Sequence, residues 1–269
     1  MCSVASVSGA RDSCVVTPVS IRDAAVACSW LAACLDGREP ADTALGVLGE
    51  LGIRAPDRTS WLDIVAEARS TRSVPYGTIP AAAGLALLLP RAGDARGLAE
   101  VPPEAYDSGA AVLLCSGDRV RAWLVPGSRA WSIVVPQGAT SISPAASWLS
   151  MTPRDADVAL RGAVLAASTD LEATGAAVPR GPDATGWQEL VRAWEEAPWP
   201  GRGAAGTDRQ ASPDVALGIR GARILAAVGA ARAYPRGLTS HDESGFRSAL
   251  EPVDRAARDA VEVAFSRVR

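Results

Sequence analysis

Asp94 and Arg96 are the residues whose types and spacing best suit a ligand site. They lie in a polar loop, residues 93–98 (GDARGL), between two apolar runs at 84–89 and 110–115. A carboxylate and a guanidinium two residues apart offer acceptors and a fork of donors to a charged small molecule. The glycines that flank the pair allow a ligand to approach the backbone closely. The loop is therefore the best candidate for a small-molecule site in the sequence. The alternative, a purely structural Asp–Arg ion pair or turn, is the interpretation that the pattern favours.

Two further side chains could carry nucleophilic or acid–base chemistry. Cys115, with Asp118 three residues later, could act as a nucleophile with an orienting acid. A thiolate would require a base or cation beside it, for which Arg119, Arg121 and His241 are the candidates. Because Cys115 ends a buried apolar run, the pattern favours a small buried hydrophobe. His241 falls with two acids in the first turn of a predicted helix, where acids complement the helix dipole, so we predict an exposed residue.

Three tryptophans suit a surface that binds another protein. Trp187 and Trp194 lie on the apolar side of a short amphipathic stretch, and Trp199 follows it. Segments rich in Gly, Pro and Ala at 175–186 and 199–210 bracket these residues. A mobile amphipathic helix of this kind is typical of an element that binds a partner or covers a groove. The alternative, which the sequence favours, is that the same helix docks onto the protein's own core.

The residue types that are missing exclude several chemistries. All 27 basic residues are arginine, because lysine is absent, and the chain has no asparagine and 1 histidine. Without lysine the chain cannot form a Schiff base, a P-loop phosphate contact or a Ser–Lys dyad. Without asparagine or a second histidine, most metal sites and most hydrolase triads lack their parts. We therefore predict no metal and no cofactor.

Residues 201–206 spell GRGAAG, which matches the dinucleotide-binding fingerprint. Pro198 and Pro200 precede it where the fingerprint requires a strand, and no βαβ pattern surrounds it. The segment is therefore interpreted as a linker.

Charge and cysteine usage bound the environment of the protein. A net charge of −3, with both signs interspersed, argues against binding to nucleic acid or to an anionic membrane. The longest uncharged run, residues 130–153, contains glutamine and several prolines, so it does not predict a membrane span. The 5 cysteines include no CxxC pair and no export signal precedes them, which predicts reduced thiols in a cytoplasmic protein.

The order of predicted elements indicates an α+β fold. Residues 1–16 lack periodicity and predict a disordered arm, and residues 17–269 predict a single domain. Within it, residues 17–73 form a helical layer, 74–150 a sheet region and 151–269 a second helical layer. The sheet has about four strands, mostly antiparallel, between residues 84 and 137.

Local signals place the helices of both layers. We predict helices over 20–36, 41–51, from about residue 60, from Pro153, over 213–234, and from Ser240 to near the C-terminus. Small residues in the 213–234 helix would let another helix approach closely. In the last helix, Glu251, Arg255 and Asp259 fall four apart, which predicts a solvated row of ion pairs. Pro252 predicts a kink there, or two abutting helices.

One segment resembles a known group of proteins. The loop GDARGL, within residues 90–114, matches a Gly-Asp-x-Arg-Gly-Leu segment that precedes a buried strand in uncharacterised proteins of high-GC actinobacteria. The segment DRAAR at 254–258, near the C-terminal end, is also similar to the corresponding segment of that group, so the resemblance spans residues 20–269. That group has no assigned activity. The resemblance therefore implies a clade and a fold arrangement, without a catalytic residue.

Two functions follow from these features. We predict a non-catalytic interaction or regulatory protein whose partner is another protein, and self-association is left open. The alternative is an enzyme that binds a small molecule through Asp94 and Arg96, with Cys115 or Asp118 assisting.

Overall fold

The structure is a computed structural model of the 269-residue chain. It describes residues 18–53, 84–91, 93–96, 98, 100–116, 119–127, 131–136, 140, 151–173, 189, 192–200, 213–233 and 240–268. The predicted arm at 1–16, the helix predicted from residue 60, the linker at 175–186, the GRGAAG segment and Trp187 lie outside the described residues.

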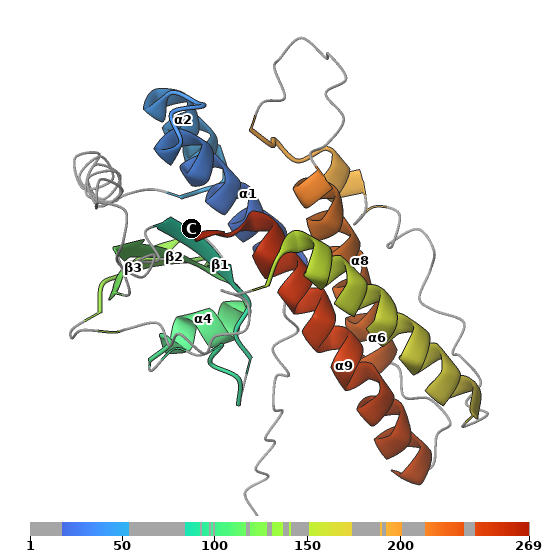
Figure 1. The fold of residues 1–269 in the computed structure, drawn as a ribbon. Helices are drawn as coiled ribbons and strands as arrows, with labels where there is room; N and C mark the ends of the chain where they lie inside the picture. The colour runs from blue at the N-terminus through green and yellow to red at the C-terminus, as the bar shows by residue number, and fades with distance from the viewer. Residues whose placement is uncertain are drawn as a thin grey trace, which may run out of the picture.

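The fold is α+β, as predicted. Along the chain, helices come first, then the strands of the sheet, then a second set of helices. The elements run in the order α1 (Pro18–Leu35), α2 (Ala41–Glu50), β1 (Gly84–Leu88), α4 (Pro103–Ser108), β2 (Ala111–Ser116), β3 (Arg119–Val125), β4 (Ser132–Val134), α6 (Pro153–Ala173), α8 (Pro213–Ala233), α9 (Ser240–Phe265) and β5 (Arg267–Val268). Figure 1 shows the sheet on one side of the molecule and α6, α8 and α9 packed together on the other. Helix α1 contacts both groups and joins them.

The sheet is antiparallel, with strand order β4-β3-β2-β1-β5. Four of its strands lie within residues 84–137, as predicted. The fifth comes from the last residues of the chain: Val268 pairs with Gly84, and Arg267 pairs with Leu85. The short β5 was not expected, because a two-residue strand leaves no periodic pattern in a sequence.

Strands β1 and β2 are buried on both faces, which is what their uniform apolar sequence predicts. One face, including Leu85, Leu87 and Val112, packs in the main core with α1. The other face packs Leu88 and Leu113 in a second cluster, together with residues of α4 and of the loop before it. The loop 91–98 is therefore held at the end of a strand that cannot move independently of the core.

Glycines in α8 allow α9 to approach closely, as the small residues of that helix predict. A Cβ at Gly221 would lie 2.8 Å from Val261 Cγ2 and 2.9 Å from the carbonyl oxygen of Ala257. Both distances are below any normal contact, so the packing requires glycine. At Gly218 an added Cβ would collide with the ring of Phe265. At these two glycines the backbone of α8 therefore lies directly against side chains and backbone of α9.

The starts of the C-terminal helices follow their sequence signals. Thr152 and Asp155 cap the helix α6, whose start at Pro153 was predicted: the Asp155 amide donates to Thr152 Oγ1 at 3.2 Å, and the Thr152 hydroxyl donates to Asp155 Oδ2 at 2.6 Å. Helix α9 continues through Pro252 as one element of 26 residues. Among the described helices, none combines the length and the apolar character that a bilayer crossing requires.

Candidate functional site

The loop after β1 forms a tight turn that directs Arg96 toward α9. Arg91 and Asp94 exchange backbone hydrogen bonds of 3.3 Å and 2.9 Å, which closes the turn. Gly93 takes a φ of +83° inside this turn, a conformation that glycine adopts at little cost. Arg96 has a φ of +55°, and its amide donates to Asp94 Oδ1 at 3.0 Å. Asp94 therefore stabilises the unusual backbone conformation that aims the Arg96 side chain.

The Arg96 guanidinium is buried between two carboxylates of α9. Its Nε donates to both carboxylate oxygens of Glu262, at 3.1 Å and 3.0 Å, and its Nη2 donates to Glu262 and to Asp259. A weaker pair at 3.6 Å joins Arg96 Nη1 to Asp94 Oδ2. The side chain of Arg96 is 5% exposed and that of Glu262 is fully enclosed. Two donors on one carboxylate make a bidentate pair, the arrangement that suits arginine best.

Burial and pairing act in opposite directions on these charges. Burial alone disfavours a charged guanidinium, but Glu262 and Asp259 outweigh that penalty and raise the pKa of Arg96 above its already high usual value. Complete burial raises the pKa of Glu262 from its usual value, against the opposing effect of Arg96 and the Leu89 amide. Each charge thus depends on the other for its compensation in the interior.

The same face of α9 covers the free edge of β1. Glu262 Oε1 accepts the Leu89 amide at 2.7 Å, and Arg258 Nη1 donates to the Leu89 carbonyl at 3.1 Å. One turn further on, Ser266 Oγ accepts the Leu87 amide at 3.0 Å. Strand β5 pairs with only the first two residues of β1, Gly84 and Leu85. The side chains of Glu262, Arg258 and Ser266 therefore form hydrogen bonds to the backbone that follows those two residues.

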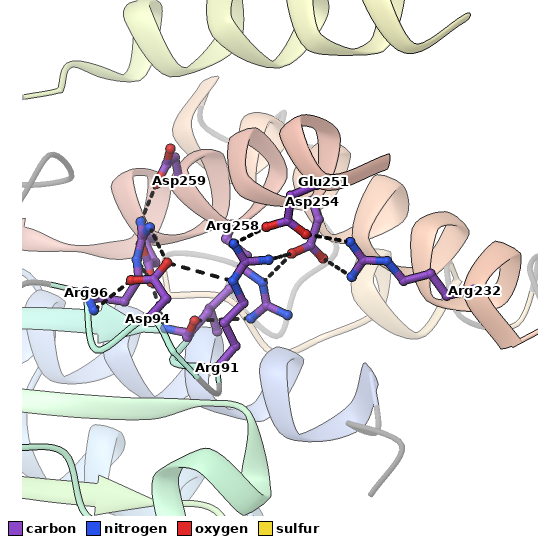
Figure 2. Close-up of polar contacts among 10 residues, drawn as sticks. Arg91, Asp94, Arg96, Arg232, Glu251, Asp254, Arg258 and Asp259 are labelled. Atoms are coloured by element: carbon purple, nitrogen blue, oxygen red, sulfur yellow. Dashed lines mark hydrogen bonds and ion pairs between the residues drawn. The ribbon is translucent and has the colours of Figure 1, made fainter. Parts of the chain in front are cut away.

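Arg91 extends the contact along α9 toward α8 (Figure 2). Its guanidinium donates to Asp254 at 2.8 Å and also pairs with Glu251. Asp254 in turn accepts from Arg258 at 3.1 Å and lies 3.5 Å from Arg232 of α8. The Asp254 side chain is 4% exposed. The ion pairs thus continue from the buried Arg96 group to the surface near α8.

Together these groups form an ion network, buried at Arg96 and exposed near α8, that ties the loop to α9 and α8. It contains four guanidinium groups and five carboxylates: Arg91, Arg96, Arg232 and Arg258 with Asp94, Glu251, Asp254, Asp259 and Glu262. Every one of these groups contacts an opposite charge of the same chain. The polar atoms of Asp94 and Arg96 therefore face the protein's own side chains. Their observed contacts are those of the alternative interpretation, an ion pair that stabilises the turn.

The carboxylates of α9 that complete this network were not predicted. The spacing of Asp259 from Glu251 and Arg255 predicted a solvated row, which is wrong: Asp259 is buried, at 8% exposure. A different spacing held the signal. Asp254, Arg258, Glu262 and Ser266 recur every four residues, so they form a polar row beside the apolar stripe of the same helix. A polar row next to an apolar stripe indicates a helix with a polar partner inside the fold.

Trp194 and Trp199 form an internal aromatic group and not an accessible surface. The Trp199 ring stacks on Phe265 with centroids 5.1 Å apart and an interplanar angle of 4°, and Trp194 lies 6.0 Å from Trp199. The two indoles are 2% and 3% exposed. Docking onto the protein's own core, the alternative interpretation, is therefore what the structure shows for both. Phe265 ends the long α9, so the phase of that helix brings its ring to the two tryptophans.

Of the remaining candidates, Asp118 lies outside the described residues, and Cys115 carries no reactive arrangement. Cys115 is buried, and burial raises its pKa to about 12, which leaves the thiol protonated and supports its interpretation as a small hydrophobe. Cys28, Cys34 and Cys115 are not joined in disulfides. His241 lies in the first turn of α9, where the sequence places it. In the described part of the chain, no group of three or more His, Cys, Asp or Glu side chains is placed to hold a metal ion.

The outward face of α6 is a second candidate, of a different kind. Of the described residues, two of the most exposed large apolar side chains lie on this helix, Val158 at 65% and Leu165 at 70%. Seven residues of helix advance by about 700°, so both point to the same side. Gly162 lies between them, and no atom lies within 4 Å of where its Cβ would stand. Arg154 and Glu172, both exposed, stand toward the two ends of this face.

No family model, no curated protein and no solved structure matches this chain.

Proposed function

We propose that this protein is a non-catalytic interaction or regulatory protein that acts by binding another protein. The observation that carries this proposal is the exposed apolar face of α6, formed by Val158, Gly162 and Leu165. Exposure of a valine or leucine forgoes about 1.5–3 kcal/mol that its burial would contribute. Two such residues two turns apart on one helix match the anchor spacing with which helices bind protein surfaces.

The alternative, an enzyme that uses Asp94 and Arg96, has less support. Both side chains make their ion pairs within the protein, and Arg96 is almost completely enclosed. A catalytic base or a ligand-binding arginine must reach the molecule on which it acts. Here a ligand would first have to displace Glu262 and Asp259 from the guanidinium, and both buried carboxylates would lose the cation that compensates their charge.

The compartment and origin of the protein belong to the same proposal. A reducing, cytoplasmic location stays a prediction from the cysteine usage of the sequence. Membership in the uncharacterised actinobacterial group stays a prediction from the GDARGL segment.

Photo-crosslinking tests the proposed function directly. A benzophenone amino acid replaces Leu165 in the full chain, and a matched variant carries it at Ala227, an exposed position of α8. Cells of the native host are irradiated and the adducts are identified by mass spectrometry. We expect one dominant protein adduct from position 165, which position 227 does not form. The adduct should also disappear when Val158→Glu is added on the same face. Equal labelling from positions 165 and 227 would contradict an interaction through α6.

A further inference from the structure

We infer that the partner that covers α6 is a second copy of this chain, with the two α6 helices packed antiparallel about a two-fold axis. The inference rests on the proposed function, because it names the occupant of the same face. It follows from the order of charged and apolar side chains along that face. When a second copy of the face is placed antiparallel to the first, opposite charges meet and the apolar residues pack together.

The residues involved lie on one narrow strip of the helix. At 100° per residue, Arg154, Val158, Gly162, Leu165 and Glu172 fall within an arc of about 80°. The two large apolar residues and Gly162 occupy the middle of the strip, and the two charged residues occupy its ends. All five are exposed in the single chain. An apolar middle with charged ends is the usual anatomy of a protein interface.

The signs of the end charges select the antiparallel arrangement. Arg154 lies near the N-terminus of α6 and Glu172 near its C-terminus, and the midpoint between them is adjacent to Gly162. In an antiparallel pair, Arg154 therefore meets the partner's Glu172, and the same contact repeats at the other end. A parallel pair would instead place Arg154 beside the partner's Arg154. The antiparallel arrangement also opposes the two helix dipoles, so each helix end lies next to charge of the opposite sign.

The middle of the strip fits the same axis. Val158 and Leu165 lie at nearly equal distances on either side of Gly162, so each Leu165 would pack against the partner's Val158. Gly162 presents no side chain and leaves open space around its Cβ position, which permits the two backbones to approach at the axis. Arg161, the other cation beside the strip, is already paired with Asp157, which also accepts from Arg220 of α8. Its charge is therefore compensated before the copies meet.

Sedimentation velocity of the purified full chain tests the inference. We expect wild type to shift reversibly from monomer to dimer as concentration rises. Leu165→Glu should raise the dissociation constant by about tenfold or more, because the change enters the symmetric interface twice. Val135→Glu, a matched change at an apolar residue that is 65% exposed outside α6, should leave it unchanged. A wild-type chain that stays monomeric throughout, or equal weakening by both variants, would overturn the inference.

A charge exchange tests the orientation of the two helices. Arg154→Glu alone and Glu172→Arg alone should each weaken self-association, because each creates two like-charge contacts per dimer. Both changes place charges that suit the helix dipole, so neither should unfold α6. When the two variants are mixed, each end of the mixed pair regains an opposite-charge contact, and a heterodimer should form at lower concentration than either homodimer. Equal association of the mixture and the single variants would overturn the antiparallel pairing.

The two proposals fail in different ways. A position-165 adduct between two copies supports both the interaction function and the inferred dimer. An adduct with a different protein would sustain the interaction function and overturn the dimer. Absence of any specific adduct from position 165, together with monomeric wild type, would overturn both.

Discussion

Two regions of the molecule differ in which residue types they bury. One is the loop 91–98 with its partners on α9, and the other is the outward face of α6. The first buries charge: Arg96, Glu262 and Asp259 lie inside the protein, and each is matched by an opposite charge. The second exposes apolar groups: Val158 and Leu165 face outward from the bundle. Residue type alone would place the charges outside and the apolar groups inside. A buried charge that is fully paired indicates a structural role, whereas an exposed apolar strip indicates that something else completes it.

Removal of the buried cation should have the largest effect. Arg96→Met leaves Glu262 and Asp259 in the interior without their guanidinium, so we expect the free energy of unfolding to fall by about 3–5 kcal/mol. Urea denaturation of the purified protein measures it. Arg247→Met, which breaks the exposed pair with Glu243, is the control and should change the midpoint little.

The double variant Arg96→Met/Glu262→Met sharpens the same test. With both charges gone, the site loses its uncompensated carboxylate, and most of the stability lost in Arg96→Met should return. A double variant no more stable than the single one would show that Glu262 matters chiefly through its bond to the Leu89 amide.

The aromatic group should behave as core and not as an interface. Trp199→Ala removes a ring that stacks on Phe265, so we expect a loss of about 3–5 kcal/mol in the free energy of unfolding. Unchanged thermal and urea stability, combined with loss of the crosslink from position 165, would instead assign Trp199 to partner binding.

A glycine-to-alanine substitution should lower the free energy of unfolding in α8, where the glycine packs against α9, and raise it on the outward face of α6. Gly221→Ala places a methyl group against Val261 and Ala257, and we expect a loss of about 1–3 kcal/mol. Gly162→Ala meets nothing within 4 Å and should stabilise the monomer by about 0.5–1 kcal/mol through the higher helix propensity of alanine. Denaturation at concentrations below the dimer range compares them. Equal losses at both positions would mean that α6 is covered within the single chain.

The smallest effect is expected from the strip itself. Leu165→Ser should change the stability of the dilute monomer by less than about 0.5 kcal/mol, because the side chain contributes little to the core. The same variant should weaken self-association clearly. A loss of more than about 2 kcal/mol in the monomer would show that Leu165 is buried by another part of the same chain.

The strands and the helix ends could be predicted from local patterns. A short, uniformly apolar run is typical of a strand covered on both faces, and the runs at 84–89 and 110–115 contain β1 and most of β2. The Thr152–Asp155 cap forms from residues three apart, so its geometry is contained in the sequence itself. The glycines of α8 likewise indicated a close helix contact, because absence of a side chain is visible without knowledge of the partner.

The candidate sites could be predicted only in part. The sequence identified Asp94 and Arg96 as a pair but not the carboxylates of α9, since Glu262 lies 166 residues from Arg96 along the chain. It singled out Trp187, Trp194 and Trp199, yet the burial of Trp194 and Trp199 depends on Phe265, which a separate helix delivers. It placed Val158 and Leu165 in a predicted helix, away from the apolar stripe of Leu160, Val164, Ala167 and Leu171 that does pack, but it did not show whether another part of the chain would cover them.

The sequence by itself therefore determined the elements of this protein: apolar runs, caps, glycines and helix phase act over a few residues. Only the tertiary structure decided which charges are buried together and which apolar face stays open. The physical reason is that burial is a property of two surfaces, and the second surface comes from a distant part of the chain. The packing of α9 against β1 encloses Arg96, and the packing of α6 on α9 leaves Val158 and Leu165 facing outward.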